Sequence, residues 1–196
     1  MNVAQEKSDL RKHLLDIRNG IPEKVWSEKS SVIGKKLMEL QEFQSSETIH
    51  CFVSMNARKE VNTHTLLMEL TSSDKEVIVP KTNFETVMLE HSKLNSFEEL
   101  KQNKWGVLEP ETLTAFDSEI DLIIVPLLAA DRYFNRLGYG KGFYDRFLHS
   151  SKAIKVGLLF DEFLFDEIPV EDFDEKLDIL ITDKKTVKRN NEGLIS

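Results

Sequence analysis

The sequence predicts an α/β protein whose central sheet is mainly parallel. Short apolar runs rich in β-branched and aromatic residues alternate with segments of helical periodicity, which is the pattern of strand–helix–strand units. The run Ile120–Pro126 is the clearest strand, and a glycine-rich loop and a helical segment follow it. With 196 residues, 40% of them hydrophobic and 31% charged, the chain is expected to form a single soluble domain, 1–196.

The first part of the chain is expected to form two helices. Leu10 and Leu14 lie on one apolar stripe within residues 4–19, and Gly20 can end that helix. Proline is favoured in the first turn of a helix, so a second helix is expected to begin at Pro22. Its predicted core-facing residues are Val25, Lys29 through its aliphatic stem, Val32, Ile33, Leu37 and Leu40.

The middle of the chain is expected to alternate between strands and helical segments. Ile49–Ser54, Glu76–Pro80 and Val87–His91 are rich in residues that favour strands. Thr63–Leu70 is predicted to be a helix, and Phe97–Leu100 fits a single helical turn.

After the central strand, two further strands are predicted, at Lys155–Phe160 and Leu177–Thr182. The polar tail from Asp183 is expected to fray. In parallel sheets, ligands bind at the carboxyl ends of the strands. One rim of the sheet should therefore carry the loops that follow Val53, Pro80, Pro126 and Phe160.

The loop after the central strand is suited to binding an anion. Gly138, Gly140 and Gly142 fall within five residues, although the chain has only eight glycines. Glycines let the backbone approach an anion closely, and the helix that follows directs its positive end there. The pattern is not a Walker A loop, because Lys141 is followed by glycine, and it lacks the G-x-G-x-x-G dinucleotide fingerprint.

The charge around the loop favours an anionic ligand. Residues 131–148 contain four basic and two acidic side chains within a chain of net charge −8. Arg136 and Lys141 lie in the loop itself, and positive charge kept in such a place attracts anions. From the glycines alone, a flexible turn without a ligand is an equally good interpretation.

Composition excludes several other classes of function. The isoelectric point of about 5.2 argues against nucleic-acid binding. The single cysteine, Cys51, rules out an internal disulfide and any multi-cysteine metal site. No apolar stretch approaches the length of a membrane span, and the N-terminus lacks the apolar region of a signal peptide. We therefore expect a cytoplasmic protein that binds neither nucleic acid nor membrane.

Three basic residues in the first helix share one face. Lys7, Arg11 and Arg18 are separated by four and seven residues, which is helical spacing. Considered alone, this segment is best interpreted as a solvated basic face.

The segment from Arg136 to Leu148, R-L-G-Y-G-K-G-F-Y-D-R-F-L, closely resembles the signature of the 5-formyltetrahydrofolate cyclo-ligase family. Six other segments occur in the order typical of that family: Lys7–Arg11, Lys59–Thr63, Val77–Pro80, Gly106–Pro110, Asp121–Pro126 and Asp174–Thr182. The resemblance therefore covers nearly the whole chain.

Four positions depart from the family pattern. Leu127 and Phe134 stand where glycine is common, and Ala130 stands where phenylalanine is common. Phe173 replaces a histidine found in many members. None of these departures removes a charged group from the predicted site.

The resemblance implies a fold and a reaction. The fold would be a three-layer sandwich with helices on both faces of the sheet, similar to sugar-phosphate isomerases and CoA transferases. The reaction would use ATP with Mg²⁺ to convert 5-formyltetrahydrofolate to 5,10-methenyltetrahydrofolate, with release of ADP and phosphate. The formyl oxygen would be phosphorylated, and N10 would then attack the activated carbon. We expect a monomer that binds these two small molecules.

The resemblance also implies roles for individual residues. Lys141, Arg136 and Tyr144 are expected to be catalytic, and Asp145 and Asp174 are expected to hold Mg²⁺. The residues expected to bind ATP are Lys7, Ser8, Asp9, Leu10, Arg11, Arg18, Arg136, Leu137, Gly138, Tyr139, Gly140, Lys141, Gly142, Phe143 and Tyr144. Those expected to bind the folate are Val53, Met55, Glu60, Trp105, Tyr139, Gly140, Lys141, Gly142 and Phe143.

Two other classes of function are compatible with parts of this pattern. A sugar-phosphate isomerase or acyl-transfer enzyme would need a general base and no ATP. The face formed by Lys7, Arg11 and Arg18 argues against it, because a monophosphate needs fewer cations. A folate-binding or regulatory protein without catalysis is the other alternative, and the intact set of charged residues argues against that one.

Overall fold

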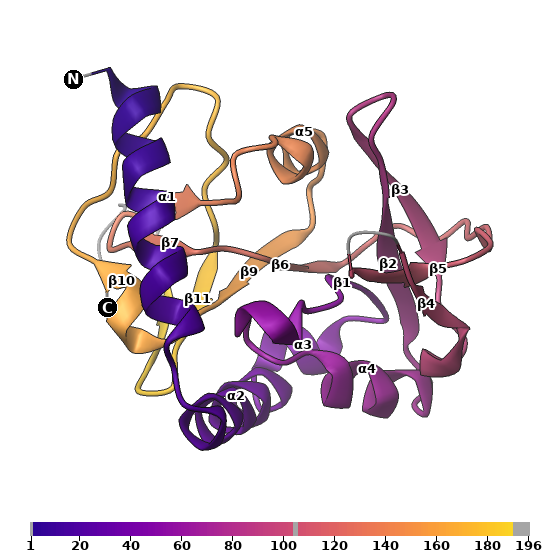
Figure 1. Ribbon diagram of the computed structural model, residues 1–196. Coiled ribbons are helices and arrows are strands. Elements are labelled where there is room, and N and C mark those ends of the chain that lie inside the picture. Colours follow the sequence, from indigo (N-terminus) through magenta and orange to yellow (C-terminus); the bar gives the residue numbers. More distant parts are fainter. Residues whose placement is uncertain (1, 104–105, 190–196) are drawn as a thin grey trace.

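A seven-stranded sheet forms the centre of the protein in the computed structural model, which describes residues 2–103 and 106–189 (Figure 1). In spatial order its strands are β12 (Thr186–Lys188), β11 (Ile179–Ile181), β9 (Ile154–Leu158), β6 (Leu122–Val125), β1 (Thr48–Cys51), β2 (Glu76–Asn83) and β3 (Met88–Lys93). The inner strands pair in parallel, whereas the edge strands β3 and β12 are antiparallel to their neighbours. The predicted α/β class with a mainly parallel sheet is confirmed.

The strand order changes direction between β1 and β6. The chain passes from β1 to β2 on one side, and then places β6, β9 and β11 in succession on the other side. The loops that leave β1 and β6 therefore diverge, which opens a crevice at the carboxyl ends of these strands.

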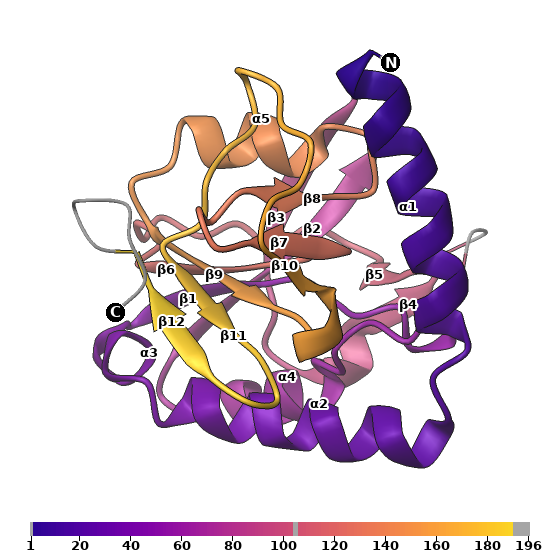
Figure 2. The same ribbon diagram turned by 90° about the vertical axis from the view of Figure 1, so that its left-hand side faces the viewer.

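Helices cover both faces of the sheet (Figures 1 and 2). On one face lie α2 (Glu23–Met38), α3 (Gln41–Ser45) and α4 (His64–Thr71), and on the other lies α5 (Phe143–His149). Helix α1 (Val3–Asn19) runs along one side of the molecule, from the level of α2 to that of α5 (Figure 2). None of the helices in the described part of the chain is both long and apolar enough to cross a membrane.

The core is apolar because the inner strands are covered on both faces. Each residue of Leu122–Val125 in β6 is fully buried. Helix α2 buries a stripe at helical spacing that consists of Trp26, Ser30, Ile33 and Leu37. Val25 and Val32, predicted to face the core, are 38% and 40% exposed, so that prediction is wrong. Each directly precedes a residue of the buried stripe, Trp26 or Ile33, and is therefore turned about 100° away from it.

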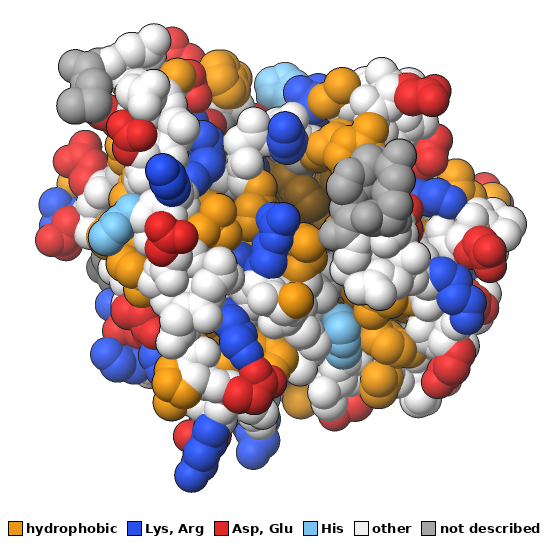
Figure 3. Space-filling model, in the orientation of Figure 1, with side chains coloured by type: hydrophobic (Ala, Val, Ile, Leu, Met, Phe, Trp, Pro, Cys, Tyr) orange, Lys and Arg blue, Asp and Glu red, His pale blue; other side chains and the backbone are white. Residues whose placement is uncertain are grey.

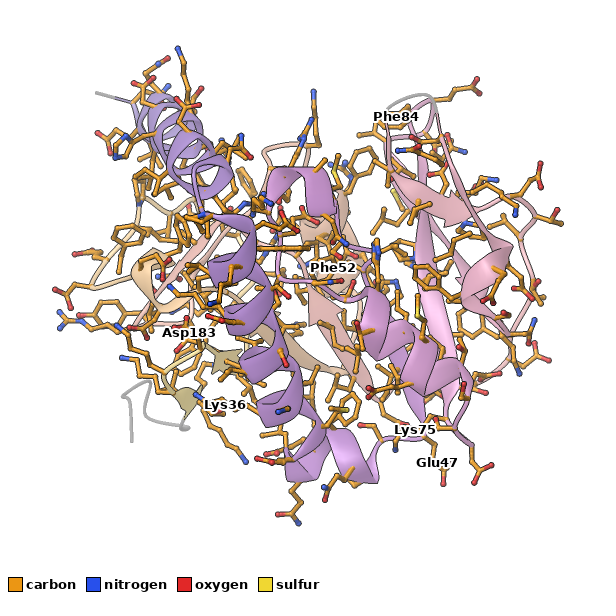
Figure 4. All side chains as sticks on the ribbon, turned by 60° about the horizontal axis from the view of Figure 1, so that its bottom comes forward. Lys36, Glu47, Phe52, Lys75, Phe84 and Asp183 are labelled. Atoms are coloured by element: carbon orange, nitrogen blue, oxygen red, sulfur yellow. The ribbon has the colours of Figure 1, made fainter. Side chains whose placement is uncertain are left out.

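The polar tail forms a strand as far as it is described. β12 pairs with β11, and Val187 packs into the core at 6% exposure. Lys36 on α2 donates hydrogen bonds to the carbonyl oxygens of Thr182 (3.1 Å) and Asp183 (3.0 Å) in the turn between the two strands (Figure 4). The prediction that the chain frays from Asp183 is therefore wrong for residues 186–188, because the open edge of β11 provides a partner.

Several short elements complete the described chain. A three-stranded sheet consists of β10 (Leu164–Phe165), β7 (Ala129–Asp131) and β8 (Arg136–Leu137), and a two-stranded sheet pairs β4 (Leu100–Gln102) with β5 (Leu108–Pro110). The single-turn helices are η1 (Asn56–Arg58), η2 (Phe97–Glu99) and η3 (Asp161–Phe163). The helical turn predicted near Phe97 is therefore confirmed.

The tight turn between β7 and β8 delivers the chain into the glycine loop. Phe134 adopts a left-handed backbone there, with φ of 65°, which explains why glycine suits this position. A left-handed conformation costs an L-residue about 1–2 kcal/mol. Complete burial of the phenyl ring offsets this cost by about 1.5–3 kcal/mol. The buried Asp131 carboxylate closes the turn by accepting hydrogen bonds from the backbone N–H groups of Tyr133 and Asn135, at 2.9 and 3.0 Å.

Candidate active site

A cavity of about 200 Å³ lies in the crevice at the carboxyl ends of β1, β2 and β6. Figure 3 shows a hollow with apolar side chains inside it and basic side chains at its rim. Phe52, Val53, Pro80 and Pro126 line the cavity, so three of the four loops predicted to share a rim do so. Phe160, which begins the fourth loop, is buried elsewhere in the core.

The glycine loop forms one wall of the cavity, and each glycine makes room for an arginine. A Cβ atom at Gly138 would lie 2.6 Å from Nη1 of Arg136. Gly140 and Gly142 have positive φ angles of 82° and 68°, which favour glycine. A Cβ at these two positions would lie within about 3 Å of the guanidinium groups of Arg11 and Arg146, respectively. The loop therefore concentrates positive charge beside its own backbone.

Arg136 is a buried cation with one side-chain partner. Its Nη2 donates to Oδ1 of Asp145 at 2.5 Å, and its Nη1 donates to the carbonyl oxygen of Pro126 at 3.1 Å. Asp145 lies in the first turn of α5, where the helix dipole also favours a carboxylate. The predicted catalytic cation and the predicted metal ligand are thus in contact.

Lys7 is held in the same way by the acidic segment 161–178, which contains nine acidic residues and one lysine. Its side chain is almost completely buried, and Nζ contacts Oδ1 and Oδ2 of Asp174 at 2.7 and 2.5 Å. A second carboxylate, that of Glu171, accepts from Nζ at 2.8 Å. Arg11 lines the cavity one helical turn further along, and its Nε donates to the Gly138 carbonyl oxygen at 2.8 Å. The interpretation of this helix face as solvated is therefore wrong for Lys7, and it is also wrong for Arg18, which is 3% exposed.

Five residues predicted to bind ATP do not line the cavity. Ser8 and Asp9 are exposed on α1, and Leu10 packs against the core. Leu137 is fully buried in β8. Arg18 is also buried, and it lies behind the cavity wall rather than at its surface.

Arg18 belongs to a buried network that joins α1 to two walls of the cavity. Its Nη2 donates to the hydroxyl of Tyr139 at 2.7 Å, and its Nε donates to the carbonyl oxygen of Arg58 at 2.9 Å. The Tyr139 hydroxyl in turn donates to Oε1 of Glu60, whose Oε2 accepts from the Met55 N–H at 2.7 Å. The glycine loop is therefore connected through one hydroxyl group to Glu60, the carboxylate that is predicted to bind the folate.

Burial governs the ionisation of this network. It raises the pKa of Glu60, and the guanidinium of Arg18 is the largest influence in the opposite direction. Burial also raises the pKa of Tyr139, which keeps its hydroxyl protonated and able to donate.

Some polar groups that line the cavity have no hydrogen-bond partner. In the described part of the chain, the buried atoms of this kind include Arg136 Nε, Tyr144 Oη and Glu109 Oε2. Burial raises the pKa of Tyr144 well above its ordinary value, so its hydroxyl is a neutral donor. Buried polar groups are nearly always bonded in proteins, so three unpartnered polar atoms on side chains that line one cavity indicate a polar ligand there.

The wall opposite the glycine loop comes from the β2–β3 hairpin and from β5. Thr82, Leu89 and Glu109 line the cavity there, and none of them was predicted as a site residue. The sequence signal for Glu109 was its place in the Gly106–Pro110 segment of the family pattern. Val53 and Met55 line the cavity as predicted, whereas Trp105 lies outside the described residues.

The hairpin is tied to the glycine loop. Arg146 donates to the carbonyl oxygen of Val87 through Nε and Nη2, at 3.0 and 2.7 Å, and to that of Lys141 at 3.0 Å. The rings of Phe84 and Phe143 meet edge to face, with centroids 5.8 Å apart. Phe84 lies at the hairpin tip, at the top of the view in Figure 4. The side chain of Lys141 is exposed at the cavity and has no ion-pair partner among the described residues.

Asp145 and Asp174, the predicted Mg²⁺ ligands, suit a metal ion that is held jointly by the protein and by a bound phosphate compound. Asp145 and Asp174 both line the cavity. Among residues 2–103 and 106–189, no group of three His, Cys, Asp or Glu side chains could hold a metal alone. Two carboxylates completed by phosphate oxygens and water are what Mg²⁺ commonly uses in nucleotide sites.

Comparisons with known proteins identify the family. The model of the 5-formyltetrahydrofolate cyclo-ligase family matches residues 3–183. A probable 5-formyltetrahydrofolate cyclo-ligase of Schizosaccharomyces pombe is 32% identical, over 95% of this chain and 99% of its own. The 5-formyltetrahydrofolate cyclo-ligase of Escherichia coli is 33% identical, over 71% and 80% respectively. The NMR structure of Aquifex aeolicus 5,10-methenyltetrahydrofolate synthetase superposes with a TM-score of 0.81 at 31% identity, covering 92% of this chain and 91% of that one. The protein is therefore an enzyme of the 5-formyltetrahydrofolate cyclo-ligase family.

Proposed function

We propose that the protein converts 5-formyltetrahydrofolate to 5,10-methenyltetrahydrofolate, with the Mg²⁺ complex of ATP as the phosphoryl donor and with release of ADP and phosphate. The observation that carries the proposal is a single cavity with two unlike walls. One wall is the basic glycine loop, and the other is apolar with buried carboxylates. A triphosphate fits the first wall, and a reduced pterin ring, which is flat and rich in N–H groups, fits the second.

On the nucleotide side, the chain supplies charge where the transferred phosphoryl group needs it. Lys141 and Arg136 would contact the oxygens of that group, together with backbone N–H groups of the loop. Arg11 would hold the remaining phosphates. The Tyr144 hydroxyl, a neutral donor without a partner, would orient the formyl oxygen or the phosphate attached to it.

The internal ion pairs would exchange partners when the nucleotide binds. Lys7 and Arg136 would turn from Asp174 and Asp145 toward phosphate oxygens, and the two carboxylates would then hold Mg²⁺. When bound, Mg²⁺ supplies neutralising charge on the phosphates. Pairing in the absence of ligand keeps each buried charge compensated, because an unpaired buried charge is costly.

On the folate side, Val53 and Met55 would pack against the flat rings, and Glu60 would accept hydrogen bonds from ring N–H groups. The γ-phosphoryl group moves from ATP to the formyl oxygen, which leaves ADP. N10 then attacks the formyl carbon and loses its proton to solvent, the carbon–oxygen bond breaks, and the oxygen departs as phosphate. We further propose that residues 1–196 form one domain that acts as a monomer in the cytoplasm.

A turnover assay tests this function against its alternatives. The purified protein is mixed with 5-formyltetrahydrofolate, ATP and Mg²⁺, and the absorbance of the methenyl product is followed. We expect product only when all three are present. Absence of an ATP-dependent signal would contradict the proposal. Binding of the folate without turnover would favour the folate-binding alternative, and phosphosugar isomerisation without ATP would favour the isomerase.

A further inference from the structure

Glu109 has an unpartnered carboxylate in the wall of the cavity. It lies in β5, and its Oε2 is buried without a hydrogen-bond partner. No hydrogen bond or ion pair joins its side chain to a described residue. Lys101 lies opposite Glu109 in the β4–β5 pair, but its ammonium group donates to the Glu98 carbonyl oxygen instead. The side chain as a whole is half-buried, but a buried carboxylate oxygen is costly without a donor, so this geometry indicates that a ligand supplies one.

The neighbours of Glu109 restrict what that ligand can be. Val107 and Leu108, which precede Glu109 in the chain, also line the cavity, and Leu89 of the hairpin lines it too. The cations of the site lie on α1 and in the glycine loop, on the other wall. A flat, apolar ring with two adjacent N–H donors on its edge matches a carboxylate set in such a surface, because both oxygens can accept in parallel.

Glu60 is less available for such a bidentate contact. Its Oε1 already accepts from Tyr139 and its Oε2 from the Met55 N–H, so one lone pair remains on each oxygen. We propose that Glu109 accepts the paired hydrogen bonds of the 2-amino and N3–H groups of the pterin ring. Glu60 then contacts other N–H groups of the folate. This inference rests on the proposed function, since the pterin is the ring of the proposed substrate.

The first experiment compares two substitutions in the full-length protein. Glu109→Gln keeps the shape of the side chain but replaces one acceptor by a donor, which mispairs with an N–H edge. Glu111→Gln is the matched control, because Glu111 is exposed and contacts Lys81 only through its backbone oxygen in the described structure. Binding of 5-formyltetrahydrofolate is measured by calorimetry without ATP, and circular dichroism checks that both variants are folded.

We expect Glu109→Gln to raise the Kd about 10- to 100-fold, which is the effect of losing a charge-assisted hydrogen bond. Glu111→Gln should change the Kd by roughly twofold at most, as surface substitutions do. A Glu109→Gln protein that is folded and binds as tightly as the Glu111→Gln control would overturn the inference. The turnover assay on the wild type would still decide the proposed function.

The second experiment identifies the edge of the ring. An analogue of 5-formyltetrahydrofolate that carries a methyl group in place of the 2-amino group is titrated into both proteins. The wild type should bind the analogue about 10- to 100-fold more weakly than the natural compound, whereas Glu109→Gln should bind both almost equally. Equal losses in the two proteins would show that Glu109 does not face this edge. If the binding results are as expected but the wild type produces no methenyl product, the inference stands and the proposed function fails.

Discussion

Lys141 differs from the other cations that line the cavity because its ammonium group has neither an ion-pair nor a hydrogen-bond partner in the described structure, whereas Arg11 donates to the Gly138 carbonyl oxygen. Lys7 and Arg136 are each held at 2.5 Å by a carboxylate. Lys141 therefore meets an incoming phosphate without first giving up a partner. This makes it the residue whose loss should affect chemistry most and folding least.

Lys141→Ala should lower turnover roughly 10²- to 10³-fold, as loss of one positioned transition-state contact typically does. The melting temperature should stay near that of the wild type, because the side chain is exposed. Lys152→Ala is the matched control, since Lys152 is exposed and lies outside the cavity. Near-normal turnover of Lys141→Ala would remove the phosphate role proposed for the loop.

The raised pKa of Glu60 predicts that the free energy of unfolding depends on pH. Burial raises its pKa in the folded state, so the folded protein holds this proton more tightly than the unfolded chain does. The resulting stability is present below the ordinary pKa of glutamate and is lost as the pH rises through the raised pKa. Urea unfolding at a series of pH values should show this decline in the wild type and a weaker one in Glu60→Gln. Identical pH profiles would mean that the buried network does not hold Glu60 as described.

At the scale of elements, the β2–β3 hairpin and the glycine loop act as two sides of one opening. Residues Thr82 and Leu89 of the hairpin line the cavity, and the exposed Arg146 of α5 holds the hairpin tip through Val87. The hairpin extends beyond the rest of the sheet in Figure 1, and this contact links its tip to the α5 side of the cavity, together with the contact of Phe84 with Phe143. The width of the opening should therefore depend on Arg146.

Arg146→Ala should loosen the hairpin tip without unfolding the protein. Backbone amides of residues 83–88 should exchange with solvent roughly 10-fold faster, which corresponds to the loss of about one hydrogen bond to a charged group. Hydrogen exchange measured by mass spectrometry checks this. Arg132→Ala serves as the control, because Arg132 is exposed and its ion pair is long, at 3.8 Å, and made with an exposed carboxylate. Unchanged exchange at the hairpin would show that Arg146 does not hold it.

At the scale of the whole molecule, local patterns predicted the sheet well. The run Ile120–Pro126 contains β6, which is fully buried, because a continuous apolar run suits a strand covered on both faces. The core-facing residues of the second helix were predicted in part: Ile33, Leu37 and Leu40 are buried, as expected, whereas Val25 and Val32 are exposed beside the buried stripe. Helical periodicity in the sequence shows which residues share one side of a helix. Only the packing of the folded protein decides which of these residues contact the core.

The site was predicted in part for a similar reason. The spacing of Lys7, Arg11 and Arg18 places them on one helix face, but α1 spans several neighbours. Lys7 therefore meets the acidic segment, Arg11 meets the glycine loop, and Arg18 meets Tyr139 behind it. Glu109 was missed because only the folded chain reveals that its carboxylate lacks a partner.

The central claim is that the formyl oxygen is phosphorylated in this cavity and leaves as phosphate. 5-Formyltetrahydrofolate labelled with oxygen-18 in the formyl group is converted with ATP and Mg²⁺, and the released phosphate is analysed by mass spectrometry. We expect the label to appear in the phosphate, at one labelled oxygen for each methenyl product formed. Label found in water, with unlabelled phosphate, would contradict phosphorylation of the formyl oxygen.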